Sequence, residues 1–255
     1  MIQRNPPARM NNLNSQRLVA HRGWPMRYPE NTLAGFSAAI ACGARLLECD
    51  VQLTQDHVAV VFHDPNLERM TNARGDLRSR NVCELRDVVI KPTPNSEPPP
   101  QTLHIPKLEQ LIETIAQNPQ VHLFVEIKSE SIEHFGRRMV VDEVLKACAA
   151  CRSQITLISR DADCLVRIRK CSAHAIAWIP GGNDRETRTR ACKLNPDILF
   201  ISARYLSNAA PPPWPCAAKW GVYTLNDPAA IQARFEAGFD YVETDDVGTM
   251  IKQLQ

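Results

Sequence analysis

Four short motifs hold the side chains with the most capacity for chemistry, and the first is His21-Arg22-Gly23. It follows the apolar run Leu18–Ala20 directly. A histidine can transfer protons near neutral pH, and an adjacent arginine can hold a phosphate through two parallel hydrogen bonds. The glycine would let the backbone turn sharply. A surface turn with incidental charges fits this tripeptide equally well, so its function depends on its neighbours.

The second motif places two carboxylates, Glu48 and Asp50, inside the otherwise apolar run Leu46–Leu53. Residues two apart on a strand point to the same face, so both side chains would project together. Buried without a partner, they would raise each other's pKa. A divalent cation removes this conflict, and oxygen ligands suit Mg²⁺ or Ca²⁺ better than zinc. A structural ion-pair network is the alternative, and we favour the metal.

The third motif is His63-Asp64, and its position depends on a tight turn at Gln55–His57. That connection is too short for a helix, so Val58–Phe62 should run antiparallel to the preceding strand as a hairpin. The hairpin would return His63 to about the level of Asp50. A second histidine near the carboxylates suggests an acid and a base on opposite sides of a phosphate.

The fourth motif, Glu126-Ile127-Lys128, ends the run HLFVEIK. Glu126 and Lys128 share one face of this strand. Glu126 could complete the protein ligands of the metal, and Lys128 could contact phosphate. A salt bridge between the two residues explains the motif equally well.

Strands that alternate with amphipathic helices must position these motifs, which predicts a parallel sheet with crossover helices. Removal of the hairpin strand leaves eight parallel candidates, enough for a closed (β/α)8 TIM barrel. An open doubly wound sheet is the alternative, and the absence of GxGxxG after the first strand disfavours it. The predicted strands are Leu18–Ala20, Leu46–Leu53, Val58–Phe62, His122–Ile127, Ile155–Ser159, Ala175–Ile179, Ile198–Ser202, Gly221–Leu225 and Tyr241–Glu243. The predicted helices are Thr32–Cys42, Lys107–Gln117, Gly136–Cys151, Ala162–Cys171, Arg185–Leu194 and one from Asn226 or Asp227 to Gly238.

Two segments lack this periodicity. Residues 1–16 are polar and are expected to form a flexible tail, which leaves residues 17–255 as a single catalytic domain. Residues 64–106 are irregular and include KPTPNSEPPP. A long irregular insertion beside a catalytic end is more often a lid or small subdomain than a spacer.

Composition excludes several classes of function. Lys plus Arg total 30 and Asp plus Glu total 28, a net charge of +2 that predicts no strong attraction to nucleic acid or to anionic membranes. No apolar run reaches the roughly 18 residues of a membrane helix, and the first sixteen residues do not resemble a signal peptide. Nine scattered cysteines favour a reducing compartment, so we expect a cytoplasmic protein.

Taken together, HRG, PENT (residues 29–32), E-x-D, HD and EIK resemble the glycerophosphodiester phosphodiesterase family. YTLN and GFDYVETDD resemble later elements of that family, so the likeness covers nearly the whole domain. The resemblance implies a TIM barrel and metal-dependent hydrolysis of substrates such as glycerophosphocholine and glycerophosphoethanolamine to glycerol 3-phosphate and an alcohol. It implies one divalent cation, Mg²⁺ or Ca²⁺, with Mn²⁺ as a further option. By motif, the catalytic acid and base are His21 and His63, the metal ligands are Glu48, Asp50 and Glu126, and the phosphate-binding residues are Arg22 and Lys128.

Two departures from the family pattern affect the preference for the head group. Tyr223 replaces the usual Trp, and Arg160 follows Ser159 where the family tends to have an aromatic residue. One alternative function is lysophospholipase D-type hydrolysis of lysophospholipids, which needs an apolar groove. Another is a non-catalytic barrel that binds glycerophosphodiesters, although such a protein would be expected to lack a histidine or a carboxylate of the set. The sequence leaves the oligomeric state open.

Overall fold

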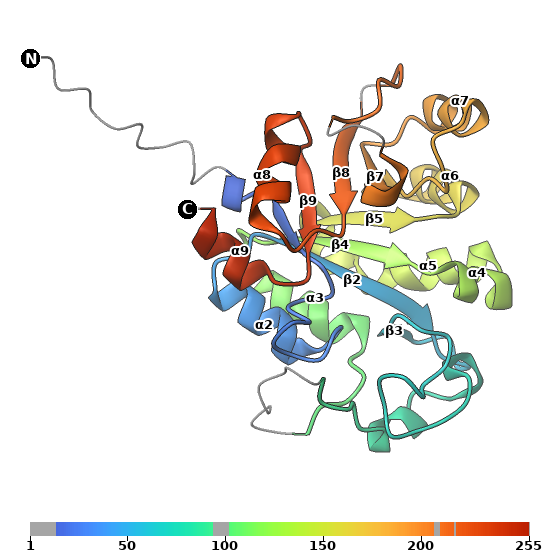
Figure 1. Cartoon of the computed structure of the whole chain (residues 1–255). Helices are drawn as coiled ribbons and strands as arrows, with labels where there is room; N and C mark the ends of the chain where they lie inside the picture. The colour runs from blue at the N-terminus through green and yellow to red at the C-terminus, as the bar shows by residue number, and fades with distance from the viewer. Residues whose placement is uncertain (1–13, 94–101, 207–209, 217, 255) are drawn as a thin grey trace, which may run out of the picture.

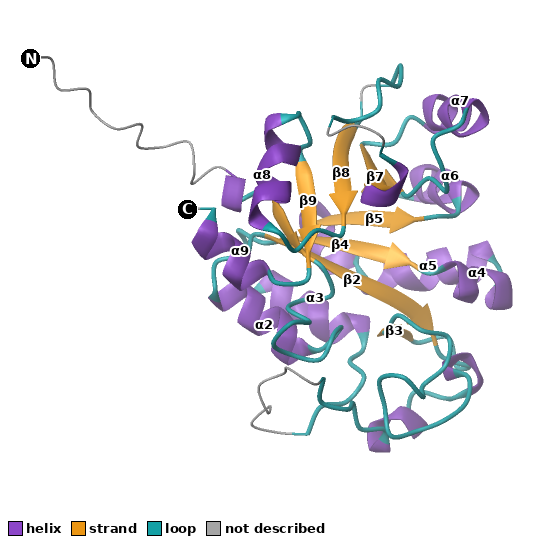
Figure 2. Ribbon diagram, viewed as in Figure 1, coloured by secondary structure: helices purple, strands orange, loops and turns teal. Residues whose placement is uncertain are grey.

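The protein folds as a closed parallel barrel of eight strands surrounded by helices, a (β/α)8 TIM barrel (Figure 2). The computed structural model describes residues 14–93, 102–206, 210–216 and 218–254. The first strand pairs in parallel with both the second and the last, which closes the sheet. The strands are β1 Leu18–Ala20, β2 Leu46–Leu53, β3 Ala59–Val61, β4 His122–Ile127, β5 Ile155–Ser159, β6 Ala175–Trp178, β7 Ile198–Ser202, β8 Lys219–Tyr223 and β9 Tyr241–Thr244.

The outer helices confirm the predicted alternation, with differences at their ends. The α-helices are α2 Leu33–Ala41, α3 Leu108–Ala116, α4 Ser129–Phe135, α5 Arg137–Ala147, α6 Ala162–Cys171, α7 Arg185–Leu194, α8 Pro228–Glu236 and α9 Val247–Gln253. The predicted helix at 136–151 ends earlier, and a 3₁₀ segment, Ala149–Gln154, follows it. Two helices of seven residues, α4 and α9, were not predicted, because so short a segment shows little periodicity. Strand β8 begins and ends two residues earlier than predicted.

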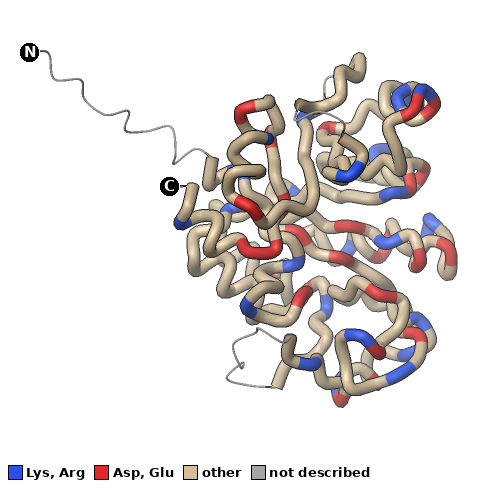
Figure 3. The backbone as a smooth tube through the Cα atoms, in the orientation of Figure 1, with Lys and Arg blue, Asp and Glu red and all other residues tan. Residues whose placement is uncertain are grey.

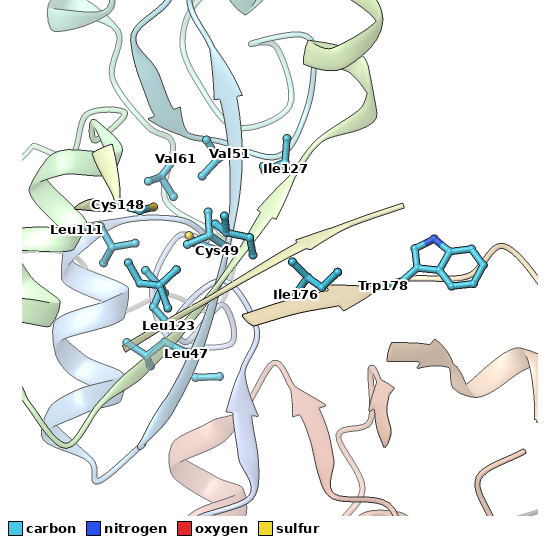
Figure 4. Close-up of a cluster of buried hydrophobic side chains, with 14 of the residues drawn as sticks. Leu47, Cys49, Val51, Val61, Leu111, Leu123, Ile127, Cys148, Ile176 and Trp178 are labelled. Atoms are coloured by element: carbon cyan, nitrogen blue, oxygen red, sulfur yellow. The ribbon is translucent and has the colours of Figure 1, made fainter. Parts of the chain in front are cut away.

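Strand alternation separates two apolar layers. On β2, Leu47, Cys49 and Val51 point outward and pack with Leu111 of α3 in the core between barrel and helices (Figure 4). Inside the barrel, a separate cluster is made of Val19, Phe124, Ile158, Ala177, Ile179, Ile198 and Phe200. Glu48 therefore points into the interior, between outward-facing apolar neighbours.

The hairpin predicted from the turn at 55–57 is present. Strand β3 pairs antiparallel to β2, with Val51 opposite Val61. His57 adopts φ 61°, and the Thr54 amide donates to the Val58 carbonyl at 3.0 Å, which closes the turn. After β3, the Phe62 amide donates to the Asp50 carbonyl at 2.9 Å. The chain thus returns to the level of Asp50 just before the His-Asp motif.

The insertion after β3 forms a lobe of loops and two short 3₁₀ segments, Leu77–Ser79 and Glu84–Asp87, beside the barrel (Figure 1). Residues 94–101 of the predicted 64–106 insertion lie outside the described residues, as do residues 1–13 of the predicted tail. The lobe has its own apolar cluster: Val60, Phe62, Leu67, Met70, Leu77, Leu85, Val88, Ile90, Leu103 and Ile105. At the other end, Asn14 Nδ2 donates to Gln232 of α8 at 3.0 Å, so structure begins before residue 17.

No helix in the described part of the chain is long and apolar enough to cross a membrane. All nine cysteines have free thiols. Basic and acidic positions are interspersed along the backbone (Figure 3), in agreement with the net charge of +2. The cytoplasmic location stays a prediction.

Candidate active site

A cavity of ≈ 220 Å³ lies where the strands end and gathers six of the seven predicted site residues. The seventh, Asp50, is buried and contacts two of them, Arg22 and Lys128. Carboxyl ends of barrel strands share one face, which explains how segments far apart in the chain meet here. The lining is His21, Arg22, Glu48, His63, Glu126, Lys128, Ile158, Arg160, Ile179, Tyr223, Thr224 and Glu243.

Three carboxylates meet inside the barrel. Glu48 and Asp50 come from β2, and Glu126 comes from the neighbouring strand β4, where it stands opposite Asp50 in the register. One oxygen from each residue lies within 4.8 Å of the others. Glu48 is buried, and its Oε1 atom has no hydrogen-bond partner among the described residues. This uncompensated oxygen beside two further carboxylates fits a hard divalent cation.

The same carboxylates also form the ion-pair network that was the alternative prediction. Lys128 Nζ donates to Asp50 Oδ1 and Glu126 Oε1, both at 3.1 Å. Arg22 Nε lies 3.0 Å from Asp50 Oδ2, and Asn31 Nδ2 donates to the same oxygen at 2.9 Å. Two cations are therefore directed at Asp50, whereas Glu48 has no side-chain cation in contact among the described residues.

The pKa values of Asp50 and Glu48 shift in opposite directions, because of the two only Asp50 contacts cationic side chains among the described residues. Burial would raise the pKa of Asp50, but Lys128 and Arg22 outweigh that effect and hold the pKa below its usual range. Burial raises the pKa of Glu48 well above its ordinary value, and the negative charge of Asp50 raises it further. Glu48 is thus the carboxylate that a bound cation would relieve most.

The loop after β1 adopts a constrained backbone. Arg22 has φ 54° and Gly23 has φ 91°, both in the left-handed region that glycine tolerates best. A Cβ on Gly23 would lie 2.9 Å from the Gly35 backbone, so a larger residue does not fit. The turn directs the Arg22 amide to Glu48 Oε2 at 3.1 Å. The predicted sharp turn is confirmed, and it ties the first motif to the acidic cluster.

His21 is held by the last strand. Its Nδ1 atom lies 2.7 Å from Asp245 Oδ1, and Asn226 Nδ2 donates to the other oxygen of that carboxylate at 2.9 Å. Burial would lower the pKa of His21. The hydrogen bond with Asp245 and the charge of Glu48 outweigh this effect and raise the pKa to about 9.

His63 has a similar arrangement at the edge of the insertion. Its Nδ1 atom lies 2.6 Å from Asp64 Oδ1. Arg69 makes an ion pair with Asp64 and another with Glu30, where Nη2 and Oε1 are 2.7 Å apart. Gln52 Nε2 also donates to the His63 carbonyl at 2.9 Å. Each histidine thus has a carboxylate on Nδ1, which leaves Nε2 for other contacts.

Sequence reasoning did not assign a role to several residues that the fold brings here. Asp245 and Glu243 lie two apart in the quoted segment GFDYVETDD, at the end of the last strand. That spacing repeats the Glu48/Asp50 pattern and could have identified them. Glu30 lies in the quoted PENT motif. Arg69 could not have been found, because nothing local in the insertion points to the barrel.

The model of the glycerophosphoryl diester phosphodiesterase family matches residues 21–210. A glycerophosphodiester phosphodiesterase from Bacillus altitudinis is 34% identical over 142 residues, which are 51% of this chain and 56% of the relative. The chain therefore spans little more than half the length of that relative.

Two solved structures share the fold over nearly their whole length. One is an Oleispira antarctica phosphodiesterase in complex with the product sn-glycerol-3-phosphate, with a TM-score of 0.78, 20% identity, and coverage of 93% of this chain and 96% of that chain. The other is a glycerophosphodiester phosphodiesterase from Thermotoga maritima, with a TM-score of 0.69, 25% identity, and coverage of 93% and 97%. With the family model matching most of the chain, this protein belongs to the glycerophosphoryl diester phosphodiesterase family, a family of enzymes that hydrolyse phosphate diesters.

Proposed function

We propose that this protein hydrolyses glycerophosphodiesters to glycerol 3-phosphate and an alcohol with the help of one divalent cation. The proposal depends on one observation: three carboxylates with oxygens within 4.8 Å of one another lie at the same cavity as two histidines. The Nδ1 atom of each histidine contacts a further carboxylate. Small head groups such as choline and ethanolamine suit a cavity of ≈ 220 Å³ better than an acyl chain does.

Glu48, Asp50 and Glu126 would hold the cation. Its oxygen ligands favour Mg²⁺ or Ca²⁺, with Mn²⁺ as a further option. The cation would neutralise charge that develops on the phosphate oxygens. The unpartnered Oε1 atom of buried Glu48 supports this assignment, because a structural ion-pair network would leave that oxygen uncompensated.

Arg22 and Lys128 would bind the phosphate of the substrate. Both line the cavity, and both are cations fixed by carboxylates: Arg22 by Glu30 and Asp50, and Lys128 by Asp50 and Glu126. These contacts orient the side chains before substrate arrives, so less side-chain entropy is lost on binding. The ion pairs also keep both pKa values above their ordinary range, so both side chains stay charged.

His21 and His63 would transfer the protons. The glycerol 2-hydroxyl attacks phosphorus as one histidine accepts its proton, and the bond from phosphorus to the leaving oxygen breaks as the other histidine protonates that oxygen. Water then opens the cyclic phosphate.

The decisive experiment measures choline release from glycerophosphocholine and from its 2-deoxy analogue, with and without a chelator, because choline is the product that both compounds share. We expect turnover of the first compound only, its loss on chelation, and recovery with Mg²⁺, Mn²⁺ or Ca²⁺. Full activity in excess chelator would exclude the metal. Equal rates on both compounds would mean that water attacks phosphorus directly, because the analogue has no internal nucleophile.

A further inference from the structure

Within the part of the chain that the structure describes, one arginine of the cavity, Arg160, makes no ion pair with a carboxylate. Arg160 follows β5, lines the cavity and is exposed to solvent. Its nearest polar side-chain contact is weak: Nη2 lies 3.5 Å from the Tyr223 hydroxyl. Among residues 14–93, 102–206, 210–216 and 218–254, no carboxylate lies within ion-pair distance of this guanidinium.

The position of Arg160 is nevertheless fixed by the fold. Trp178 Nε1 donates to the Arg160 carbonyl at 3.1 Å. The next residue, Asp161, caps α6 by accepting from two amides of its first turn and also pairs with Arg137. The backbone at Arg160 is thus held on both sides, and only the side chain is free to move at the mouth of the cavity.

Charge is distributed unevenly from the buried end of the cavity to this mouth. Glu48 and Glu243 are 2% and 6% exposed, whereas Arg160 is exposed. The other cations, Arg22 and Lys128, are buried or nearly so and are paired with carboxylates. A diester with its phosphate beside those two cations and its glycerol toward the buried end would extend its leaving alcohol toward Arg160.

The geometry points to a preference for glycerophosphodiesters whose leaving alcohol carries an anionic oxygen group, a carboxylate or a phosphate, over those with only a cationic head group. This inference rests on the proposed function. The planar guanidinium of Arg160 would form two parallel hydrogen bonds with that anion, and the Tyr223 hydroxyl would donate a third. A trimethylammonium or ammonium group alone would instead meet a like charge.

The test compares two substrates that differ by one carboxylate, glycerophosphoserine and glycerophosphoethanolamine, with glycerophosphoglycerol as the neutral reference. We expect kcat/KM of the wild-type protein to be about three- to tenfold higher for glycerophosphoserine, the scale of an exposed to half-buried charge pair. Arg160→Gln should abolish that ratio, and Arg160→Lys should keep part of it. Arg138→Gln is the matched control, because Arg138 lies on α5 with a side chain 87% exposed and does not line the cavity.

The outcomes separate this inference from the proposed function. A wild-type protein that cleaves both substrates at equal kcat/KM would overturn the inference and leave the hydrolysis intact. A uniform loss on all three substrates in Arg160→Gln would also overturn it, since Arg160 would then hold the common phosphate. Absence of any turnover would refute the proposed hydrolysis. In that case, calorimetric affinities for glycerophosphoserine and glycerophosphoethanolamine decide the inference, and equal values refute it.

Discussion

His21 Nδ1 lies 2.7 Å from Asp245 Oδ1, although 224 positions separate the two residues in the chain. Closure of the barrel through β1 and β9 brings them together. The carboxylate fixes the ring and stabilises its protonated form, so that Nε2 is the nitrogen available to a substrate. In the proposed mechanism, Asp245 would be a positioning residue that acts through His21.

Replacing Asp245 with Asn should lower the pKa of His21 by about one unit or more, because the nearest anion is lost. NMR titration of the metal-free protein measures this change. The kcat should fall by roughly tenfold or more, since proton transfer by a positioned side chain contributes about 10²-fold or more. Asp246→Asn is the neighbouring control, because Asp246 contacts Trp24 and not His21.

The same pair predicts a pH dependence of stability. The pKa of His21 is raised from 6.5 to about 9 in the folded protein, so the stabilisation is complete below pH 6.5 and is lost as the pH rises through 9. The difference in unfolding free energy between wild type and Asp245→Asn should shrink over that window. An unchanged pKa and kcat in Asp245→Asn would refute the role given to this carboxylate.

Glu48→Gln and Asp50→Asn should change stability in opposite directions. Glu48 makes no ion pair among the described residues, and burial raises its pKa more than the charge of His21 lowers it. The amide should therefore leave the metal-free protein as stable as wild type or more stable. Asp50 balances Arg22 and Lys128, and loss of its charge should cost about 3 kcal/mol. Urea unfolding in a chelator measures both values.

Both variants should also lose the stabilisation that added Mg²⁺ or Ca²⁺ gives the wild-type protein, because a neutral amide is a poorer ligand. Glu113→Gln, at an exposed position on α3, is the control and should keep that response. A wild-type response to the cation in both ligand variants would rule out these carboxylates as the metal site.

Gly221→Ala tests the packing of the barrel interior. A Cβ on Gly221 of β8 would lie 2.3 Å from the Phe200 ring, so the ring must shift. We expect a loss of about 1–3 kcal/mol in unfolding free energy. Gly181→Ala should be nearly neutral, because no described residue other than its two chain neighbours has an atom within 4 Å of the new Cβ. The additional change Phe200→Leu should recover part of the loss, and simple additivity of the two changes would argue against this contact.

Local sequence patterns predicted eight parallel strands and favoured a barrel over an open doubly wound sheet, and the family resemblance implied the barrel. The run 46–53 alternates polar and apolar residues, and the apolar set faces the helices while Glu48 and Asp50 face inward, as period-two spacing requires. The turn at 55–57 allowed only a hairpin, and the hairpin is present. Helix α4 was missed because its seven residues span barely two turns.

Long-range pairing is what the sequence could not supply. Period-two spacing indicated that Glu48 and Asp50 would lie together. It did not indicate that Arg22 and Lys128 would both contact Asp50, while Glu48 Oε1 has no hydrogen-bond partner among the described residues. Arg69 joins Glu30 to Asp64 across 39 and 5 positions of chain, and only the folded insertion brings it there. Local periodicity therefore places residues on faces, whereas tertiary structure decides which charges meet.

Glu243 offers the last prediction, because it is a buried carboxylate of the cavity for which the proposed mechanism has no role. Burial raises its pKa to about 7; the charge of His21 opposes this shift, and those of Glu126 and Asp50 add to it. The ordinary pKa of a glutamate is 4.5, so between pH 4.5 and 7 the unfolded chain releases a proton that the folded chain retains.

The unfolding free energy of the wild type should therefore fall as the pH rises from 4.5 to 7. Above pH 7, Glu243 should contribute no further change. The neutral amide introduced by Glu243→Gln mimics the protonated acid, so this variant should not show the fall. The variant should gain roughly 1–3 kcal/mol over wild type between pH 4.5 and 8 in metal-free protein, measured by urea unfolding. Glu113→Gln, at its exposed position, should show no such gain. A constant difference between Glu243→Gln and wild type across that range would mean that Glu243 is ionised throughout, and the burial argument for its raised pKa would be wrong.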